Sequence, residues 1–542
     1  MTTDKPIEEV TPYYGNIRNF FGRRVIESSL TKDELTPEKI IEILPEVLRE
    51  HEKNAEEIDY LYKYYKGNQP VLNKVKNIRP EINHKVLENH AYEFVEFRKA
   101  NDFGEPVQYI QKGEKNMENV NPEISTLNAY MESEDKSSLD KDLGEWRSIC
   151  GTAYRWVDVD SSGDEDEAPF EISVPDPRRT FVVYSSGIKG EQLFAGHYAY
   201  FSDTVMTEEK KSFHSKYREI TIYTDEYMIK VKDSLNGNYS IMPYKIEVDK
   251  DVRDIEKYPL VLTGKRIIEY PMNQSRIGDI ELVMSITDAI NQVKSNNLDG
   301  IDQFIQSLLV FINQTVDAKE FRKLVALGAV EVSSSDSNRP ADVKLLTSQM
   351  NHADTKVVTD DLYNSALSIL AIPKQNQKAS GGDTGEARLL GEGWTMAYQR
   401  AKQDDLSFKK SEREFLKTVL KICKADTRKA DEKIKNLKIS DIDIRIPRDK
   451  SDNLLVKAQA LLNLLQSGVH PEVAFSIVGL FGDPHDVYQK SAKFQGEDFW
   501  KKIKEKVDKM AEKEAVENKS KTTSSGEGND QTDKKDTVSS QE

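Results

Sequence analysis

The chain has 542 residues, of which 37% are hydrophobic and 31% are charged, and its formal net charge at pH 7 is -16. This length allows two to four packed units or one elongated protomer, and the modest hydrophobic fraction favours an elongated or assembled protein. The acidic balance argues against a broad basic face that holds nucleic acid. The isolated Cys150 and Cys423 form no zinc motif, and without a long apolar run or signal peptide we expect a soluble, unexported protein in a reducing compartment.

The N-terminal third is predicted to be mainly helical after a peripheral segment, residues 1–39. Apolar residues recur at helical spacing from Thr36, the expected N-cap, to Gly67, with Pro37 at the first helical position. Further helices are predicted over 82–102 and 125–150, with a turn and a strand between them. β-Branched and aromatic runs between turn residues then predict an antiparallel, β-rich region over 151–270.

The second half is predicted to contain long helices with a small strand insertion. A helical stripe predicts one long helix over 278–306, and a second helix follows at 352–372, where Pro373 ends it. Short strands at 308–313, 328–334 and 342–347 and a small helix at 317–328 lie between the two. A further long helix over 385–423, a strand at 439–447 and helices over 451–510 complete the α+β class, and the polar tail 511–542 is predicted to be disordered.

The stretch IPKQNQKASGGDTGEARLL, residues 372–390, looks at first like a phosphate-binding loop. It lacks the G-x-x-x-x-G-K-[ST] pattern, and Asp383 and Glu386 would repel a phosphate. The pair Gly264-Lys265 is followed by Arg266, where a magnesium-binding hydroxyl is needed. Neither stretch therefore predicts a nucleotide site, and an ordinary solvent loop is the plain alternative for residues 374–386.

Metal and catalytic motifs are equally weak. Asp158 and Asp160 resemble the start of an EF-hand loop, but Pro169 stands where the bidentate glutamate is required, so a solvated loop is favoured over residues 158–169. His84 and His90, six residues apart, would lie on different faces of a helix. No G-x-S-x-G elbow occurs and neither cysteine has a catalytic context. We expect no metal, no cofactor and no enzymatic activity.

Three stretches together resemble the portal proteins of tailed bacteriophages, in the branch typical of siphoviruses of Gram-positive hosts. They are YYKGNQPVLNKVKNIRPEINHKVLENHAYEFVEFRKANDFGEPVQYI, IIEYPMNQSRIGDIELVMSITDAINQVKSNNLDGIDQF and IRIPRDKSDNLLVKAQALLNLLQSGVHPEVAFSIVGLFGDPHDVYQK. The resemblance covers about residues 40–500 and depends on the order of these stretches as well as their wording.

The resemblance implies a protomer with a wing, a two-helix stem, an α/β clip and a helical crown, which assembles into a ring. The implied divisions are the N-terminal segment 1–39, the wing 40–277, stem helix 278–306, clip 307–351, stem helix 352–372, tunnel loop 373–386, second wing part 387–447, crown 448–510 and tail 511–542. The 158–169 loop, the first 39 residues and the tail have no role that the resemblance assigns.

The resemblance also implies the site residues. The tunnel loop would face DNA through Lys374, Gln375, Asn376, Gln377, Lys378, Ser380, Gly381, Gly382, Asp383, Thr384 and Gly385. Its two lysines would touch a duplex while the acidic remainder limits tight binding. The clip would dock partner proteins through Asp317, Lys319, Glu320, Arg322, Lys323, Asp336 and Arg339.

The implied assembly is a ring, usually of twelve subunits, at one capsid vertex of the virion, formed in the host cytoplasm. Double-stranded DNA would pass through it in packaging and ejection. The implied partners are the terminase large subunit, a head-completion adaptor, and the major capsid and scaffolding proteins, with no membrane. Two alternatives stay open: an oligomeric capsid-associated scaffold without a DNA channel, and a nucleotide-dependent packaging enzyme, for which the sequence shows no phosphate loop.

Overall fold

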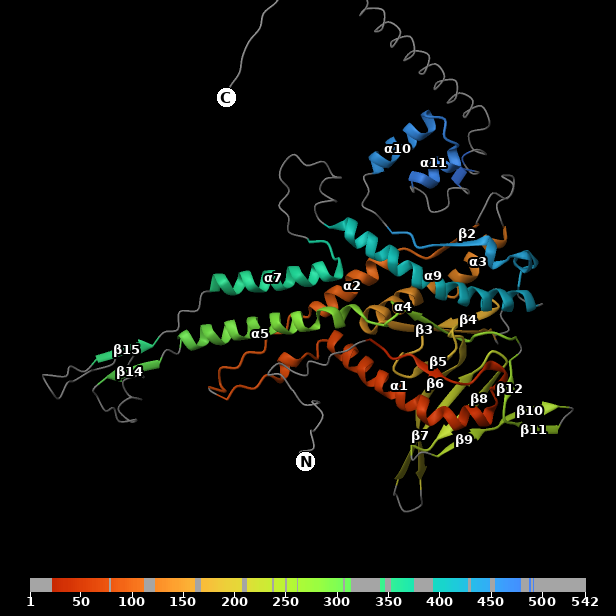
Figure 1. Cartoon of the computed structure of the whole chain (residues 1–542), viewed down its shortest axis with the longest axis horizontal. Coiled ribbons are helices and arrows are strands. Elements are labelled where there is room, and N and C mark those ends of the chain that lie inside the picture. Colours follow the sequence, from red (N-terminus) through yellow and green to blue (C-terminus); the bar gives the residue numbers. More distant parts are fainter. Residues whose placement is uncertain are drawn as a thin grey trace, which may run out of the picture. The chain divides into compact units, whose positions relative to one another are not determined.

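The computed structural model describes residues 22–77, 79–111, 122–160, 167–206, 212–235, 238–248, 251–260, 262–305, 308–312, 342–346, 352–374, 393–426, 430–448, 454–478, 487–488 and 491 (Figure 1). The chain divides into a larger compact unit, Met1–Tyr109 with Glu123–Arg448, and a smaller one, Ile110–Pro122 with Asp449–Glu542. In the smaller unit, α10 (Leu454–Gln466) and α11 (Pro471–Val478) lie within the helical region predicted from the sequence.

The larger unit contains a seven-stranded sheet of order β1-β5-β6-β7-β8-β12, with β9 paired to β8. Its strands are β1 (Ile26–Ser28), β5 (Thr180–Ser185), β6 (Gln192–Met206), β7 (Ser212–Tyr223), β8 (Tyr227–Asp233), β9 (Tyr239–Met242) and β12 (Tyr258–Pro259). All pairs are antiparallel except β1 with β5. Side chains alternate between buried and half-buried along β8, so one face of the sheet can bury its apolar residues.

Helix α1 (Pro37–Tyr65) covers this sheet with its N-terminal half. Ile40, Leu44 and Leu48 pack in one cluster with strand residues such as Phe181 and Ile220. The Thr36 side chain accepts a hydrogen bond from the Lys39 amide, which confirms the predicted N-cap. The predicted helix or pair of helices is thus one continuous helix.

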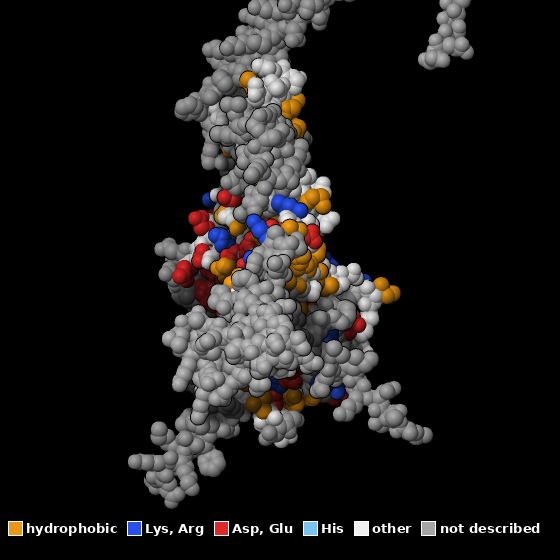
Figure 2. Space-filling view, turned by 90° about the vertical axis from the view of Figure 1, so that its left-hand side faces the viewer, with side chains coloured by type: hydrophobic (Ala, Val, Ile, Leu, Met, Phe, Trp, Pro, Cys, Tyr) orange, Lys and Arg blue, Asp and Glu red, His pale blue; other side chains and the backbone are white. Residues whose placement is uncertain are grey.

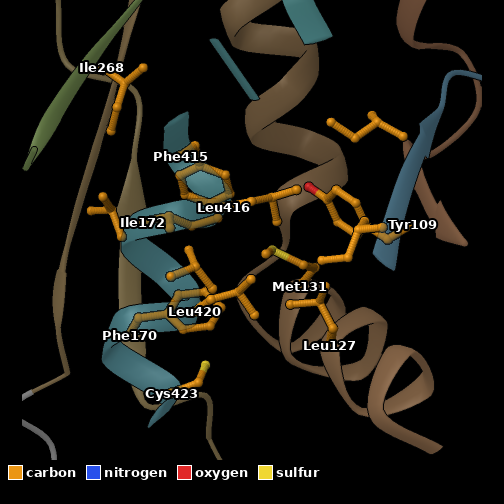
Figure 3. Close-up of a cluster of buried hydrophobic side chains, with 14 of the residues drawn as sticks. Tyr109, Leu127, Met131, Phe170, Ile172, Ile268, Phe415, Leu416, Leu420 and Cys423 are labelled. Carbon is orange, nitrogen blue, oxygen red and sulfur yellow. The ribbon is translucent and has the colours of Figure 1, made fainter. Parts of the chain in front are cut away.

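A second core lies around the three-stranded sheet β13-β3-β4. Its strands are β3 (Thr152–Val159), β4 (Phe170–Ser173) and β13 (Ile267–Pro271), and it is packed by α3 (Pro122–Ser133), α4 (Lys136–Cys150) and α9 (Trp394–Ala425). Phe415, Leu416 and Leu420 of α9 lie among side chains of the sheet and of α3 (Figure 3). This core joins residues that are more than 300 positions apart in the sequence, from Phe103 to Ile444.

The remaining elements are shorter or belong to the site described below. They are α2 (His90–Phe103), α5 (Asp279–Ile305), α7 (His352–Leu370), the strands β2 (Gln108–Gln111), β10 (Tyr244–Val248), β11 (Asp251–Ile255), β14 (Leu308–Ile312), β15 (Asp342–Leu346) and β16 (Ile442–Arg445), and the 3-10 helices η1 (Lys32–Glu34), η2 (Pro70–Asn73), η3 (Glu432–Asn436) and η4 (Ile439–Asp441). The mixture of helices and sheets confirms the predicted α+β class.

Three predictions about local structure were wrong. Residues 26–28 form a sheet strand, although they fall in the segment predicted to be peripheral. The predicted helix over 125–150 is two helices, because Asp135 adopts a left-handed backbone conformation (φ 50°) between them. Residues 82–89 precede α2 and are not helical, so His84 and His90 do not share a helix.

In the part of the chain that the structure describes, no helix is both long and apolar enough to cross a lipid bilayer.

Candidate functional site: the α5–α7 pair and the two segments it connects

Helices α5 and α7 lie side by side in antiparallel directions (Figure 1). Val283 near the start of α5 packs in one cluster with Leu367 and Leu370 near the end of α7. Phe94 of α2 belongs to the same cluster, so the pair is fixed to the rest of the larger unit at this end. The predicted helix over 278–306 and the predicted helix ending before Pro373 are both confirmed.

Each end of the helix pair leads into a segment whose two ends lie close together. At one end β14 and β15 form an antiparallel pair in which Ile312 is opposite Asp342, so residues 313–341 leave and return at one place. At the other end, a Cβ atom built on Gly393 would lie 3.8 Å from the Cα atom of Pro373. Residues 375–392 therefore also begin and end at one place, between α7 and α9.

Arg98 of α2 joins the helix ends at the second of these places. Its guanidinium donates to the Asp279 carboxylate in the first turn of α5 (3.2 Å from Nε) and to the Leu370 carbonyl at the end of α7 (3.1 Å). Negative charge is favourable at a helix N-terminus and positive charge at a C-terminus, so this one ion pair suits both helix dipoles. Arg98 and Asp279 are 4% and 1% exposed, which places the pair out of solvent.

Helix α9 joins this buried charge group through Asp404, ten positions after the first residue of the helix, Trp394; its carboxylate lies 3.7 Å from Arg98. Burial alone would lower the pKa of the Arg98 guanidinium, but Asp279, Asp102 and Asp404 raise it above its ordinary value. Burial raises the pKa of the Asp404 carboxyl to about 6, against the opposing effect of Arg98 and Arg147. The helices that enter and leave residues 375–392 are thus tied to α5 by one arginine.

Along its length α5 presents a row of polar side chains that hold an extended segment, residues 84–88. Asn291, Ser295 and Asp299 accept hydrogen bonds from the backbone amides of Glu88, Val86 and His84 at 2.8, 2.9 and 2.7 Å. Four helical residues rise about 6 Å and two extended residues about 6.6 Å, so the two repeats match. The four-residue spacing of these side chains was visible in the sequence and was missed, because the apolar stripe alone was used to predict the helix.

The Asp299 end of this row is also charged. Its carboxylate lies 2.8 Å from the Lys74 ammonium, and the two side chains are 4% and 1% exposed. Burial alone would raise the pKa of the Asp299 carboxyl, but hydrogen bonds from Lys74 and His84 lower it to about 2. The ion pair therefore fixes the segment before α2 to α5 close to the β14–β15 end.

Of the predicted DNA-facing residues the structure describes only Lys374, which is half-buried after Pro373. Gln375, Asn376, Gln377, Lys378, Ser380, Gly381, Gly382, Asp383, Thr384 and Gly385 lie outside the described residues. All seven predicted clip residues, Asp317, Lys319, Glu320, Arg322, Lys323, Asp336 and Arg339, also lie outside them, between β14 and β15 in the sequence. The predicted strand at 328–334 and small helix at 317–328 share this position. What the structure describes is the frame that carries both segments.

Charged residues of the two weaker motifs, the partial phosphate motif and the EF-hand-like stretch, form ion pairs within the fold. Lys265, which follows Gly264 in the partial phosphate motif, pairs with Glu414 at 2.9 Å. Asp158, the first residue of the EF-hand-like stretch, pairs with Arg266 at 3.0 Å. Within the described ranges no group of three or more His, Cys, Asp or Glu side chains is arranged to hold a metal ion.

One comparison with known proteins identifies the family of the chain. A family model described as phage portal protein, SPP1 Gp6-like, matches residues 45–519. A search of curated proteins finds no match. The matched range includes the α5–α7 pair, both segments it connects and the buried charge group at Arg98. The chain therefore belongs to the SPP1 Gp6-like family of phage portal proteins.

Proposed function

We propose that this chain is the subunit of a ring, with twelve copies as the expected number, that stands at one vertex of the capsid and lets double-stranded DNA pass in packaging and ejection. Membership of the portal family makes the chain a structural capsid component that assembles as an oligomer together with DNA. The observation that carries the finer proposal is the antiparallel α5–α7 pair, which joins the 313–341 segment at one end to the 375–392 segment at the other.

In this proposal the two helices are the stem, residues 307–351 are the clip and residues 373–386 are the tunnel loop. The clip would dock the terminase large subunit during packaging and a head-completion adaptor afterwards, with major capsid and scaffolding proteins around the ring. Assembly would take place in the host cytoplasm, in the branch of siphoviruses that infect Gram-positive hosts. A rigid frame suits this role, because segments that contact moving DNA or changing partners need fixed ends.

The surface charge supports a channel that does not hold DNA tightly. Figure 2, a view from the β14–β15 side, shows acidic, basic and hydrophobic side chains intermingled on the described surface of this face. With the net charge of -16, the described part of this face carries no continuous basic patch that would hold phosphates in place. DNA contact would then be confined to a few lysines, such as Lys374 and Lys378.

Exposed apolar residues on the helix pair support contact between subunits. They are Leu282 and Leu298 on α5 and Val357, Val358 and Ile369 on α7, with exposures between 39% and 67%. Subunits of a ring meet through two different surfaces, and each helix pair would pack against its neighbours. These apolar side chains, which are exposed in the isolated chain, would then be buried when the ring assembles.

Replacing both Val357 and Val358 with aspartate is expected to prevent ring formation. Each valine removed from a contact costs about 1 to 2 kcal/mol, and a buried unpaired carboxylate costs more. Negative-stain electron microscopy with particle-mass measurement should show rings many times the 61.9 kDa subunit for the wild type and small species for the variant. Ser365→Asp, on an exposed polar position of the same helix, is the matched control and should still form rings. Equal ring yield from both variants would place the interface elsewhere, and a wild type that stays monomeric at high concentration would contradict the ring.

Replacing Lys374 and Lys378 with glutamine is expected to lower the amount of DNA packaged per capsid while leaving ring and capsid formation intact. Each lysine replaced removes one contact with a DNA phosphate from every subunit of the ring. Nuclease-protected DNA per assembled particle is the measurement, and Lys53→Gln with Lys63→Gln on the exposed side of α1 is the matched control. Unchanged packaging would favour a scaffold without a channel, and steady ATP hydrolysis by the purified chain would favour the packaging enzyme.

A further inference from the structure

A large groove in the larger unit has no part in the proposed channel. It has a volume of about 1110 Å³ and lies between one face of α9 and residues of β1, β5 and β13. Its walls combine apolar side chains, including Val25, Tyr184 and Ile439, with eight basic and five acidic residues. The groove therefore has an excess of basic residues, whereas the whole chain has a net charge of -16.

The basic character comes from a stripe of lysines on α9: Lys410, Lys417, Lys421 and Lys424. Successive lysines are seven, four and three residues apart, so all four lie on one face of the helix. Lys417 pairs with Glu414, but no carboxylate partner of Lys410 or Lys424 occurs among the described residues. Lys421 donates to the Thr263 carbonyl at 3.2 Å. Three exposed positive charges thus face the groove with no negative partner in the part of the chain that the structure describes.

The first described residues of the chain lie at the rim of this groove. Gly22 has φ +82°, and a Cβ atom there would be 1.8 Å from the Ser275 carbonyl oxygen, so the chain is pressed against the turn at 273–276. The Arg23 amide donates to the Arg276 carbonyl (3.1 Å), and the Arg23 guanidinium pairs with buried Glu281 at 2.6 Å. Asn273, Gln274 and Arg276 of that turn line the groove, as do Val25 and Glu27. Residues 1–21 therefore start from a fixed point at the rim.

The sequence of residues 1–21 matches the groove in chemistry and in length. It reads MTTDKPIEEVTPYYGNIRNFF, with an adjacent pair of carboxylates at Glu8 and Glu9, one more at Asp4, two basic residues at Lys5 and Arg18, and aromatic residues between Glu9 and Gly22. Glu9 precedes Gly22 by 13 positions, so it can reach about 43 Å from the rim when extended. Lys410 and Lys424 are about 21 Å apart along α9. The segment is long enough to follow the whole lysine stripe.

We propose that residues 1–21 of the same chain lie in this groove, with Glu8 and Glu9 against the α9 lysines and the aromatic residues over its apolar wall. A nucleic acid fits less well, because every nucleotide carries a phosphate and five carboxylates line the groove, whereas residues 1–21 also carry Lys5 and Arg18, which can pair with those carboxylates. The docked segment would connect the edge strand β1 to α9. This inference is independent of the proposed ring and channel.

Cysteine pairing tests the proposal on the full-length chain. Glu9→Cys is combined with Lys421→Cys in the groove, or with Lys53→Cys on α1 as the control. Asn54 accepts from the Arg24 amide at 2.9 Å, so position 53 is also close to the start of the segment but does not line the groove. Native Cys150 and Cys423 are both buried, and burial raises the pKa of each thiol to about 12, so they should not compete.

The expected result is an intramolecular disulfide that forms roughly tenfold faster with position 421 than with position 53, because docking raises the effective concentration. A second variant tests the role of the carboxylates. It carries Glu8→Lys and Glu9→Lys, with Val10→Cys in place of Glu9→Cys, and it should lose the preference for position 421. Equal rates at 421 and 53 would overturn the proposal, as would cross-links only between chains, which would assign the groove to the segment of a neighbouring copy.

Discussion

Replacing Arg98 with methionine is expected to lower the free energy of unfolding by about 3 to 5 kcal/mol, because the buried Asp279 carboxylate loses its charged partner. Ser148 still donates to Asp279 at 2.7 Å, but a hydroxyl supplies no positive charge. The Leu370 carbonyl also loses a charged donor at the end of α7. Chemical denaturation of the variant and the wild type measures the change.

The effect should be local as well as global. Amide hydrogen exchange is expected to speed up most in the first turn of α5 and the last turn of α7, since Arg98 holds those two helix ends together. Lys99→Met is the matched control: Lys99 is the adjacent residue, its ion pairs with Glu96 and Glu145 are partly exposed, and its loss should cost less than about 1 kcal/mol. A similar loss of unfolding free energy in both variants, or faster exchange spread evenly over the chain, would show that Arg98 does not specifically hold these two helix ends together.

For the proposed function, the position of Arg98 matters more than its energy. The helices α7 and α9 that enter and leave residues 375–392 are both within reach of its guanidinium, through Leu370 and Asp404. Loosening this contact would give the 375–392 segment a less fixed base. An Arg98→Met protein that still forms rings should therefore show a packaging defect similar in direction to that of the Lys374 and Lys378 replacement.

The helices were predictable where local signals are strong. Thr36 and Pro37 fix the start of α1, the apolar repeat fixes α5, and Pro373 fixes the end of α7, all through contacts within a few residues. The break at Asp135 was not predictable, because aspartate is only moderately common in the left-handed region and the apolar pattern continues across it. The strand β1 has three residues and exists through its pairing with β5, and the two β-branched residues Val25 and Ile26 are too short a run to predict a strand from the sequence.

The buried charges were beyond reach of sequence reasoning for a different reason. Arg98 lies 181 residues from Asp279, and Arg155 lies 257 residues from Glu412. In each case the local pattern predicts a charged residue on a solvated face, since isolated charges are rarely buried. Only the approach of distant elements pairs them. The predicted site residues of the tunnel loop and the clip came from the resemblance and lie, except for Lys374, outside the described residues.

The second buried charge group lies in the core around β3 and α9 and centres on Glu412, which is 0% exposed. Its carboxylate pairs with Arg155 at 3.2 Å and Lys136 at 3.1 Å and accepts hydrogen bonds from the hydroxyls of Tyr109 and Tyr270. Asp140 pairs with both basic residues, so two positive and two negative charges balance. Although Nε of Arg155 has no hydrogen-bond partner among the described residues, the balance of charges and the remaining hydrogen bonds offset much of the cost of removing the group from water.

Replacing Glu412 with glutamine is expected to lower the free energy of unfolding by about 3 to 5 kcal/mol at pH 7, because it leaves a net positive charge in the core. Burial alone would raise the pKa of Glu412, but Lys136 and Arg155 hold it well below its ordinary value. The stabilisation from Glu412 is therefore fully present above about pH 4.5 and is lost as the pH falls toward its folded-state pKa. Denaturation curves at pH 7 and pH 4 should show the difference between wild type and variant shrink on acidification. Glu414→Gln, two residues along α9 with partly exposed partners, should cost less than about 1 kcal/mol, and an equal cost at both positions would contradict the prediction.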